Sequence, residues 1–140
     1  MPTKYNNIYV ALDFSEKSTI AFEKAKQIAK NNEGTLNLIC VIDTHSFGTV
    51  EAYDRKYAKQ LAEKAQAELE KLKQQAIEGG VKIVNTIVKE GAAKKILTNL
   101  DDADLIIVGA TGRGALEIAM LGSVSTNIVR SAKCDVLVVR

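Results

Sequence analysis

Five short apolar runs alternate along this chain with segments of helical periodicity, and that order limits the folds it can adopt. Two of the runs, LIIVG and VLVV, are apolar without alternation, which is typical of parallel strands covered by helices on both faces. Helices between successive strands impose right-handed crossovers and parallel pairing. The sequence therefore predicts an α/β fold, a single doubly wound five-stranded parallel sheet with helices on both faces. We expect the strands over residues 5–13, 36–42, 81–88, 102–110 and 134–140.

The segments between these runs carry the signals of helices. Ser15 is a suitable N-cap for a helix that runs to about Lys30, where Asn31, Asn32 and Gly34 are expected to end it. The next segment has an apolar residue every three to four positions and a charged opposite face, which indicates a long amphipathic helix. This helix and two further ones are expected over residues 51–78, 91–100 and 122–132.

Size and charge limit the function classes. A chain of 140 residues suits one domain, here residues 1–140, with a sizeable core. The 19 basic and 17 acidic side chains give a formal net charge of +2. A near-balanced charge gives no reason to expect nucleic acid or a membrane surface as a partner.

The sequence points to a cytoplasmic location. The first residues contain no apolar run of the kind that a secretory signal requires, and no stretch approaches the roughly 20 apolar residues of a membrane helix. Cys40 and Cys134 lie far apart within apolar runs and lack metal-binding spacing, so we expect buried, reduced thiols.

The fourth apolar run leads directly into a glycine-rich loop, GATGRGALEIAMLGS, residues 109–123. Doubly wound sheets bind ligands beyond the carboxyl ends of their strands. Glycine lets backbone amides approach a phosphate closely, and the amides from Gly122 to Ser125 open the last expected helix at the positive end of its dipole. The loop therefore predicts a di- or triphosphate site, although Gly109 and Gly112 can also form a simple turn and Ser123 a simple helix cap. The spacing fits neither a P-loop nor a GxGxxG motif.

The spacing of Gly109, Gly112, Gly122 and Ser123 reproduces the pattern G-x2-G-x9-G-[ST], and here the chain resembles the nucleotide-binding branch of the universal stress protein family. IYVALDFSEKS is similar to the first strand and acidic turn of that family, and GSVSTNIVRSAKCDVLVVR to its closing helix and strand. The resemblance covers essentially the whole chain. It implies an adenine nucleotide α-hydrolase-like fold with strand order 3-2-1-4-5.

The resemblance also implies a ligand and its contacts. ATP is the expected ligand, and whether Mg²⁺ accompanies it stays open. Asp13 would contact the ribose or the adenine, and a carboxylate at a strand end suits sugar hydroxyls, although it can also cap the following helix. An apolar slot for the adenine would be lined by Ala11, Val41 and Val108. The residues expected around the ribose and phosphates are Gly109, Gly112, Arg113, Gly122, Ser123, Val124 and Ser125.

The function implied by the resemblance is a nucleotide-gated switch in a stress response, acting as a homodimer paired through Asp135 to Arg140 and read by an unknown protein partner. A nucleotide-free dimeric scaffold and a slow ATPase are the alternatives. The sequence shows no Ser-His-Asp set, metal cluster or carboxylate pair, and His45 is its single histidine. Two positions depart from the family, since Ala11 and Asp135 stand where proline is common.

A phosphoacceptor receiver domain is the main competing doubly wound fold. It requires an aspartate at the end of the third strand, whereas that strand ends here in Val88-Lys89-Glu90.

Overall fold

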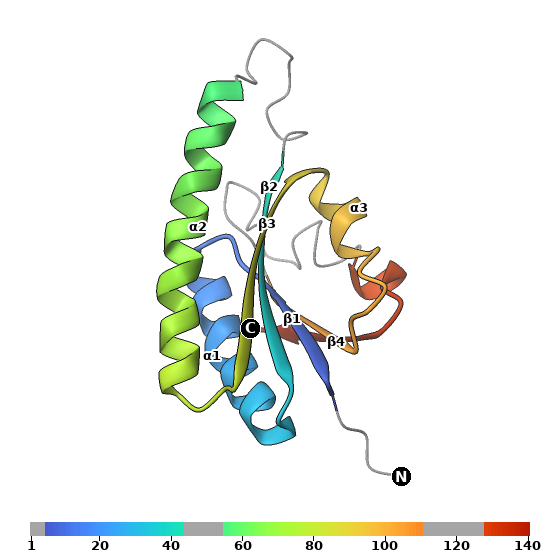
Figure 1. Cartoon of the computed structure of the whole chain (residues 1–140). Helices are drawn as coiled ribbons and strands as arrows, with labels where there is room; N and C mark the ends of the chain where they lie inside the picture. Colours follow the sequence, from blue (N-terminus) through green and yellow to red (C-terminus); the bar gives the residue numbers. More distant parts are fainter. Residues whose placement is uncertain (1–4, 44–54, 111–127) are drawn as a thin grey trace.

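The sheet has the predicted strand order. The computed structural model describes residues 5–43, 55–110 and 128–140. Its five strands are all parallel and lie in the order β3-β2-β1-β4-β5 (Figure 1). The strands are β1 Asn7–Ala11, β2 Thr35–Asp43, β3 Ile83–Gly91, β4 Leu105–Gly109 and β5 Asp135–Val139. The helices are α1 Glu16–Asn32, α2 Arg55–Glu78 and α3 Ala93–Leu97, and residues 128–131 are also helical.

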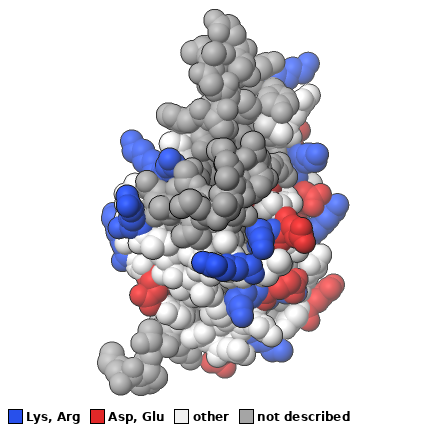
Figure 2. Space-filling view, turned by 180° about the vertical axis from the view of Figure 1, so that it is seen from behind, with Lys and Arg blue, Asp and Glu red and all other residues white. Residues whose placement is uncertain are grey.

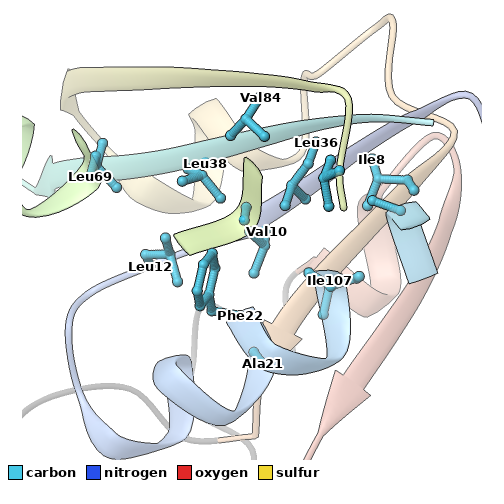
Figure 3. Packing of buried hydrophobic residues seen from close by; sticks show 14 of the residues in the cluster. Ile8, Val10, Leu12, Ala21, Phe22, Leu36, Leu38, Leu69, Val84 and Ile107 are labelled. Carbon is cyan, nitrogen blue, oxygen red and sulfur yellow. The ribbon is translucent and has the colours of Figure 1, made fainter. Parts of the chain in front are cut away.

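Helices cover both faces of the sheet, as expected for a doubly wound fold. The helices α1 and α2 lie on one face, and α3 and residues 128–131 lie on the other (Figure 1). On the α1 and α2 side, Phe22 packs against Val10 of β1 and against Leu12, which directly follows that strand (Figure 3). On the α3 side, Ile39 and Ile106 belong to a second buried cluster. Alternate residues of each strand thus feed two cores, which explains the unbroken apolar runs in the sequence.

The junction between α1 and β2 differs in detail from the prediction. Glu33, not Gly34, adopts the left-handed conformation that ends α1, with φ of 54°. Gly34 is required for a different reason, because a Cβ at this position would lie 2.6 Å from the carbonyl oxygen of Tyr5. The chain therefore turns into β2 against the backbone that precedes β1, and only glycine leaves room for that approach.

The third strand runs further than predicted. It pairs with β2 as far as the register pair Asp43 and Gly91, so Gly91 ends a strand instead of opening a helix. Lys89 and Glu90 are exposed in this stretch. Polar residues at the end of an edge strand weaken the apolar signal, which is why the pattern indicated an end at Val88.

Burial separates the two cysteines. The prediction of a buried thiol is confirmed for Cys40, but it is wrong for Cys134, which is only half-buried. Cys134 immediately precedes β5, which forms an edge of the sheet, and Val136, Leu137 and Val138 are half-buried as well. An edge strand has a neighbour on one side only, so its apolar run is less covered than that of β4.

The described surface carries both signs of charge. Figure 2 shows Lys and Arg side chains together with Asp and Glu side chains on one face of the molecule. In the part of the chain that the structure describes, no helix is both long enough and apolar enough to span a bilayer.

Candidate functional site

The carboxyl ends of β1 and β4 lie side by side, and the covering helices there belong to opposite faces. β1 pairs with β4 through register pairs that include Val10 and Ile107. The helix that follows β1, α1, packs on the face it shares with α2, whereas Ile128 packs on the α3 face. In an open α/β sheet this arrangement creates a crevice beyond the strand ends, where ligands bind.

Asp13 is held just beyond the end of β1 by a tight turn. Its Oδ1 atom accepts a 2.9 Å hydrogen bond from the backbone N–H of Ser15. Ser15, not Asp13, is the N-cap of α1, because its side chain accepts a hydrogen bond from the N–H of Ser18. Between them Phe14 adopts a left-handed φ of 63°, which is uncommon for a non-glycine residue, and packs against the core shared by α1 and α2. The turn therefore fixes one carboxylate oxygen in place.

The three residues of the apolar slot lie on one face of the sheet. Ala11 and Val41 pack against the buried cluster on the α3 face, and Val108 is a member of that cluster. Ala11 and Val108 directly follow the paired residues Val10 and Ile107, and Val41 lies two residues beyond Ile39, the register partner of Ala11. Ala11 and Val41 are half-buried, whereas Val108 is only 3% exposed. Ala11 and Val41 therefore leave part of their apolar surface accessible, whereas Val108 is almost fully covered.

Gly109 ends β4 in close contact with α1. A Cβ at Gly109 would lie 3.1 Å from each of three atoms of Lys17, its carbonyl carbon, carbonyl oxygen and Cβ. On its other side Gly109 is in register with Val139, and the N–H of Ala110 donates a 2.8 Å hydrogen bond to the carbonyl of Val139. Gly109 is thus packed between the first turn of α1 and the edge strand.

The other residues of the predicted site lie outside the part of the chain that the structure describes. They are Gly112, Arg113, Gly122, Ser123, Val124 and Ser125, and His45 lies outside it as well. Among the described residues, no group of three or more His, Cys, Asp or Glu side chains could hold a metal ion.

Sequence reasoning missed a row of asparagines at the amino-terminal half of the sheet. Asn37 is 4% exposed, and its Nδ2 donates to Oδ1 of Asn7 at 2.6 Å. Asn85 donates from its own Nδ2 to Oδ1 of Asn37 at 3.0 Å. The signal was present, since Asn37 and Asn85 each interrupt an apolar run and Asn7 begins one. These contacts cross β1, β2 and β3, at the end of the strands opposite to the crevice, and they belong to the fold and not to the site.

The chain is similar to known proteins in both sequence and fold. Residues 4–140 match the model of the universal stress protein family. A protein of Staphylococcus aureus strain USA300 that is itself assigned to the universal stress proteins is 39% identical over 140 residues, which is 97% of this chain and 84% of that protein. Among solved structures, the universal stress protein UspA from Lactobacillus plantarum superposes with a TM-score of 0.88 at 27% identity, covering 99% of this chain and 100% of the other. A universal stress protein solved in complex with cAMP has a TM-score of 0.73 at 26% identity, over 99% and 98% of the two chains.

Proposed function

Because the chain belongs to the universal stress protein family, we propose that it binds an adenine nucleotide, ATP above all, in the crevice beyond β1, β2 and β4. The observation that carries this proposal is the pairing of a fixed carboxylate with an apolar slot. Asp13 is held by its bond to Ser15, and the partly exposed Ala11 and Val41 lie at the same ends of the strands. The relative in complex with cAMP supports an adenine nucleotide as the ligand class.

Each part of the site suits one part of a nucleotide. A carboxylate accepts hydrogen bonds from ribose hydroxyls, and half-buried aliphatic side chains give a purine ring an apolar surface. The sequence of the glycine-rich loop supports a phosphate site made by the amides of residues 122–125, with Arg113 close to the phosphates. Mg²⁺ would accompany a triphosphate as part of the ligand.

The edge strand supports a homodimer as the working form. β5 has β4 as its only neighbour in the described sheet, and its residues Val136, Leu137 and Val138 are half-buried. An apolar edge strand invites pairing with another strand, and pairing with the same strand of a second copy gives a closed two-fold assembly. Nucleotide binding would change a surface that a protein partner or the second subunit reads, so that residues 1–140 act as one cytoplasmic stress-response switch domain.

Calorimetric titration of nucleotide-free protein with Mg-ATP tests the proposal. We expect micromolar affinity. Asp13→Asn should weaken it by about tenfold or more, because a hydrogen bond to a charged group contributes about 1.5–3 kcal/mol. Asp101→Asn is the matched control, since Asp101 is an exposed carboxylate paired with Lys133 at 2.6 Å and should leave the affinity unchanged.

The outcomes also separate the alternatives. If no heat of binding is measured at millimolar ATP, the protein is better explained as a nucleotide-free scaffold. In that case the dimer should still be observed in sedimentation analysis. Binding that is equal in the wild type and in Asp13→Asn would place the ligand elsewhere. Phosphate release from bound ATP over hours would indicate a slow ATPase, whereas recovery of intact ATP supports a switch.

A further inference from the structure

The contact between Gly109 and Lys17 is unusual because it involves the parts of a lysine that cannot move aside. The atoms 3.1 Å from an added Cβ are the carbonyl carbon, the carbonyl oxygen and Cβ of Lys17, and not its flexible amino end. A methyl group at position 109 would therefore push on the backbone of α1 and not on a mobile side chain.

The end of β4 has little room to move away from Lys17. Gly109 is in register with Val139, and the following residue is tied to Val139 by the 2.8 Å bond from Ala110. Ile107 and Val108, just before it, are 0% and 3% exposed. Because Gly109 is tied to β5 and the residues before it are buried, we expect the displacement to fall mainly on the first turn of α1.

The first turn of α1 is directly connected to Asp13. Lys17 lies two residues beyond the N-cap Ser15. Ser15 accepts a hydrogen bond from the N–H of Thr19 at 3.0 Å and donates its own N–H to Asp13 at 2.9 Å. A displacement of Lys17 should therefore also displace Ser15, and with it the Asp13 carboxylate.

We infer that Gly109 is a positioning residue, which sets the place of Asp13 through Lys17 and Ser15 instead of holding the phosphates itself. The absence of a side chain at position 109 lets the first turn of α1 settle on the end of β4, and the turn carries the carboxylate with it. The effect on ligand affinity rests on the proposed nucleotide function, but the mechanical link does not.

The link is tested first without any ligand. In Gly109→Ala we expect shifted amide resonances and faster amide exchange at Ser15, whose N–H is held by Asp13. Gly79→Ala is the matched control, since its Cβ would also meet backbone carbonyls, Gln75 at 3.3 Å and Ala76 at 3.5 Å, at the far end of α2. Unchanged Ser15 resonances in a folded Gly109→Ala protein would overturn the inference, even if the wild type binds no nucleotide.

A ligand series then separates positioning from phosphate contact. If Gly109 acts through Asp13, Gly109→Ala should lower the affinities for adenosine, AMP and Mg-ATP by the same factor, on the order of tenfold. In the double variant with Asp13→Asn the two losses should not multiply, because both act on one interaction. A loss that grows with the number of phosphates, or losses that multiply, would contradict the inference.

The wild-type complex gives an independent check should Gly109→Ala fail to fold. In a crystal structure with AMP or ATP, the inference requires Lys17 packed on Gly109 and no phosphate oxygen within hydrogen-bond distance of Gly109. A phosphate bonded to the Gly109 backbone would overturn it.

Discussion

The hydroxyl of Tyr5 donates a 2.8 Å hydrogen bond to Oδ2 of Asp135, which joins the segment before β1 to the first residue of the edge strand β5. Tyr5 also donates its backbone N–H to Oδ1 of Asn32, the last residue of α1, at 3.1 Å. Tyr5 thus ties together three parts of the chain that are far apart in sequence. The contact with Asp135 fixes the start of the strand through which we propose that the dimer forms.

Removing either partner of the Tyr5–Asp135 bond should cost little stability. We expect Tyr5→Phe and Asp135→Asn each to lower the free energy of unfolding in urea by about 0.5–1 kcal/mol, because the bond is exposed to solvent. The double variant should lose no more than about the larger of the two, since both changes remove one interaction. Fully additive losses would mean that the two side chains act independently.

Tyr9 should make the fold sensitive to high pH. Burial, then the 2.9 Å hydrogen bond from its hydroxyl to Oδ1 of Asp102 and the negative charge there, raises the pKa of Tyr9 to about 12. The unfolded chain loses this proton near pH 10, so between about pH 10 and 12 the unfolded state binds fewer protons than the folded state. Stability is therefore fully present below pH 10 and falls as the pH rises through this window, by up to about 2.7 kcal/mol in total.

The contribution of Tyr9 can be separated from that of other groups that titrate at high pH. Urea unfolding of the wild type and Tyr9→Phe should be compared from pH 8 to pH 12. The phenylalanine variant lacks the hydroxyl, so its stability should fall less steeply above pH 10. Parallel curves for the two proteins would show that Tyr9 does not titrate differently in the folded and unfolded states.

Asn37 should be the most sensitive member of the asparagine row. It is buried and bonded to Asn7, to the backbone carbonyl of Ile8 and to Asn85, so Asn37→Ala removes three hydrogen bonds and leaves a cavity within the sheet. We expect a loss of about 2–3 kcal/mol in the free energy of unfolding, against about 0.5 kcal/mol for Asn85→Ala, because Asn85 is exposed and water can replace it. Equal losses in the two variants would show that the row is not a buried network.

Much of the fold follows from local patterns in the sequence. The alternation of apolar runs and helical segments predicts the parallel sheet and its two covered faces, because crossover handedness and burial leave few alternatives. The strand order required the resemblance, since no local pattern specifies which strands are neighbours. Glu33 was missed as the end of α1 because a left-handed glutamate is uncommon, and Gly34 offered a more usual explanation.

The site is harder to predict than the fold because its geometry depends on contacts between distant segments. The positions of Ala11, Asp13 and Val41 at strand ends follow from the strand pattern. The packing of Gly109 on Lys17 does not, because it depends on how closely α1 approaches β4. Nor does any local signal predict the left-handed Phe14 that shapes the turn after Asp13, since phenylalanine rarely adopts that conformation.

Val41 offers a test of the apolar slot, because its neighbour in sequence faces the other way. Val41 packs on the α3 face of β2, while Ile42 packs against the core under α1 and α2. We expect Val41→Asn to lower the affinities for adenosine, AMP and Mg-ATP alike, by about three- to tenfold, because a polar amide replaces apolar surface under the purine. Ile42→Asn, the matched control, should lower the melting temperature while leaving these affinities unchanged. Titration of both variants by calorimetry decides the matter, and a Val41→Asn protein that binds all three ligands as the wild type does would exclude the α3 face of β2 from the site.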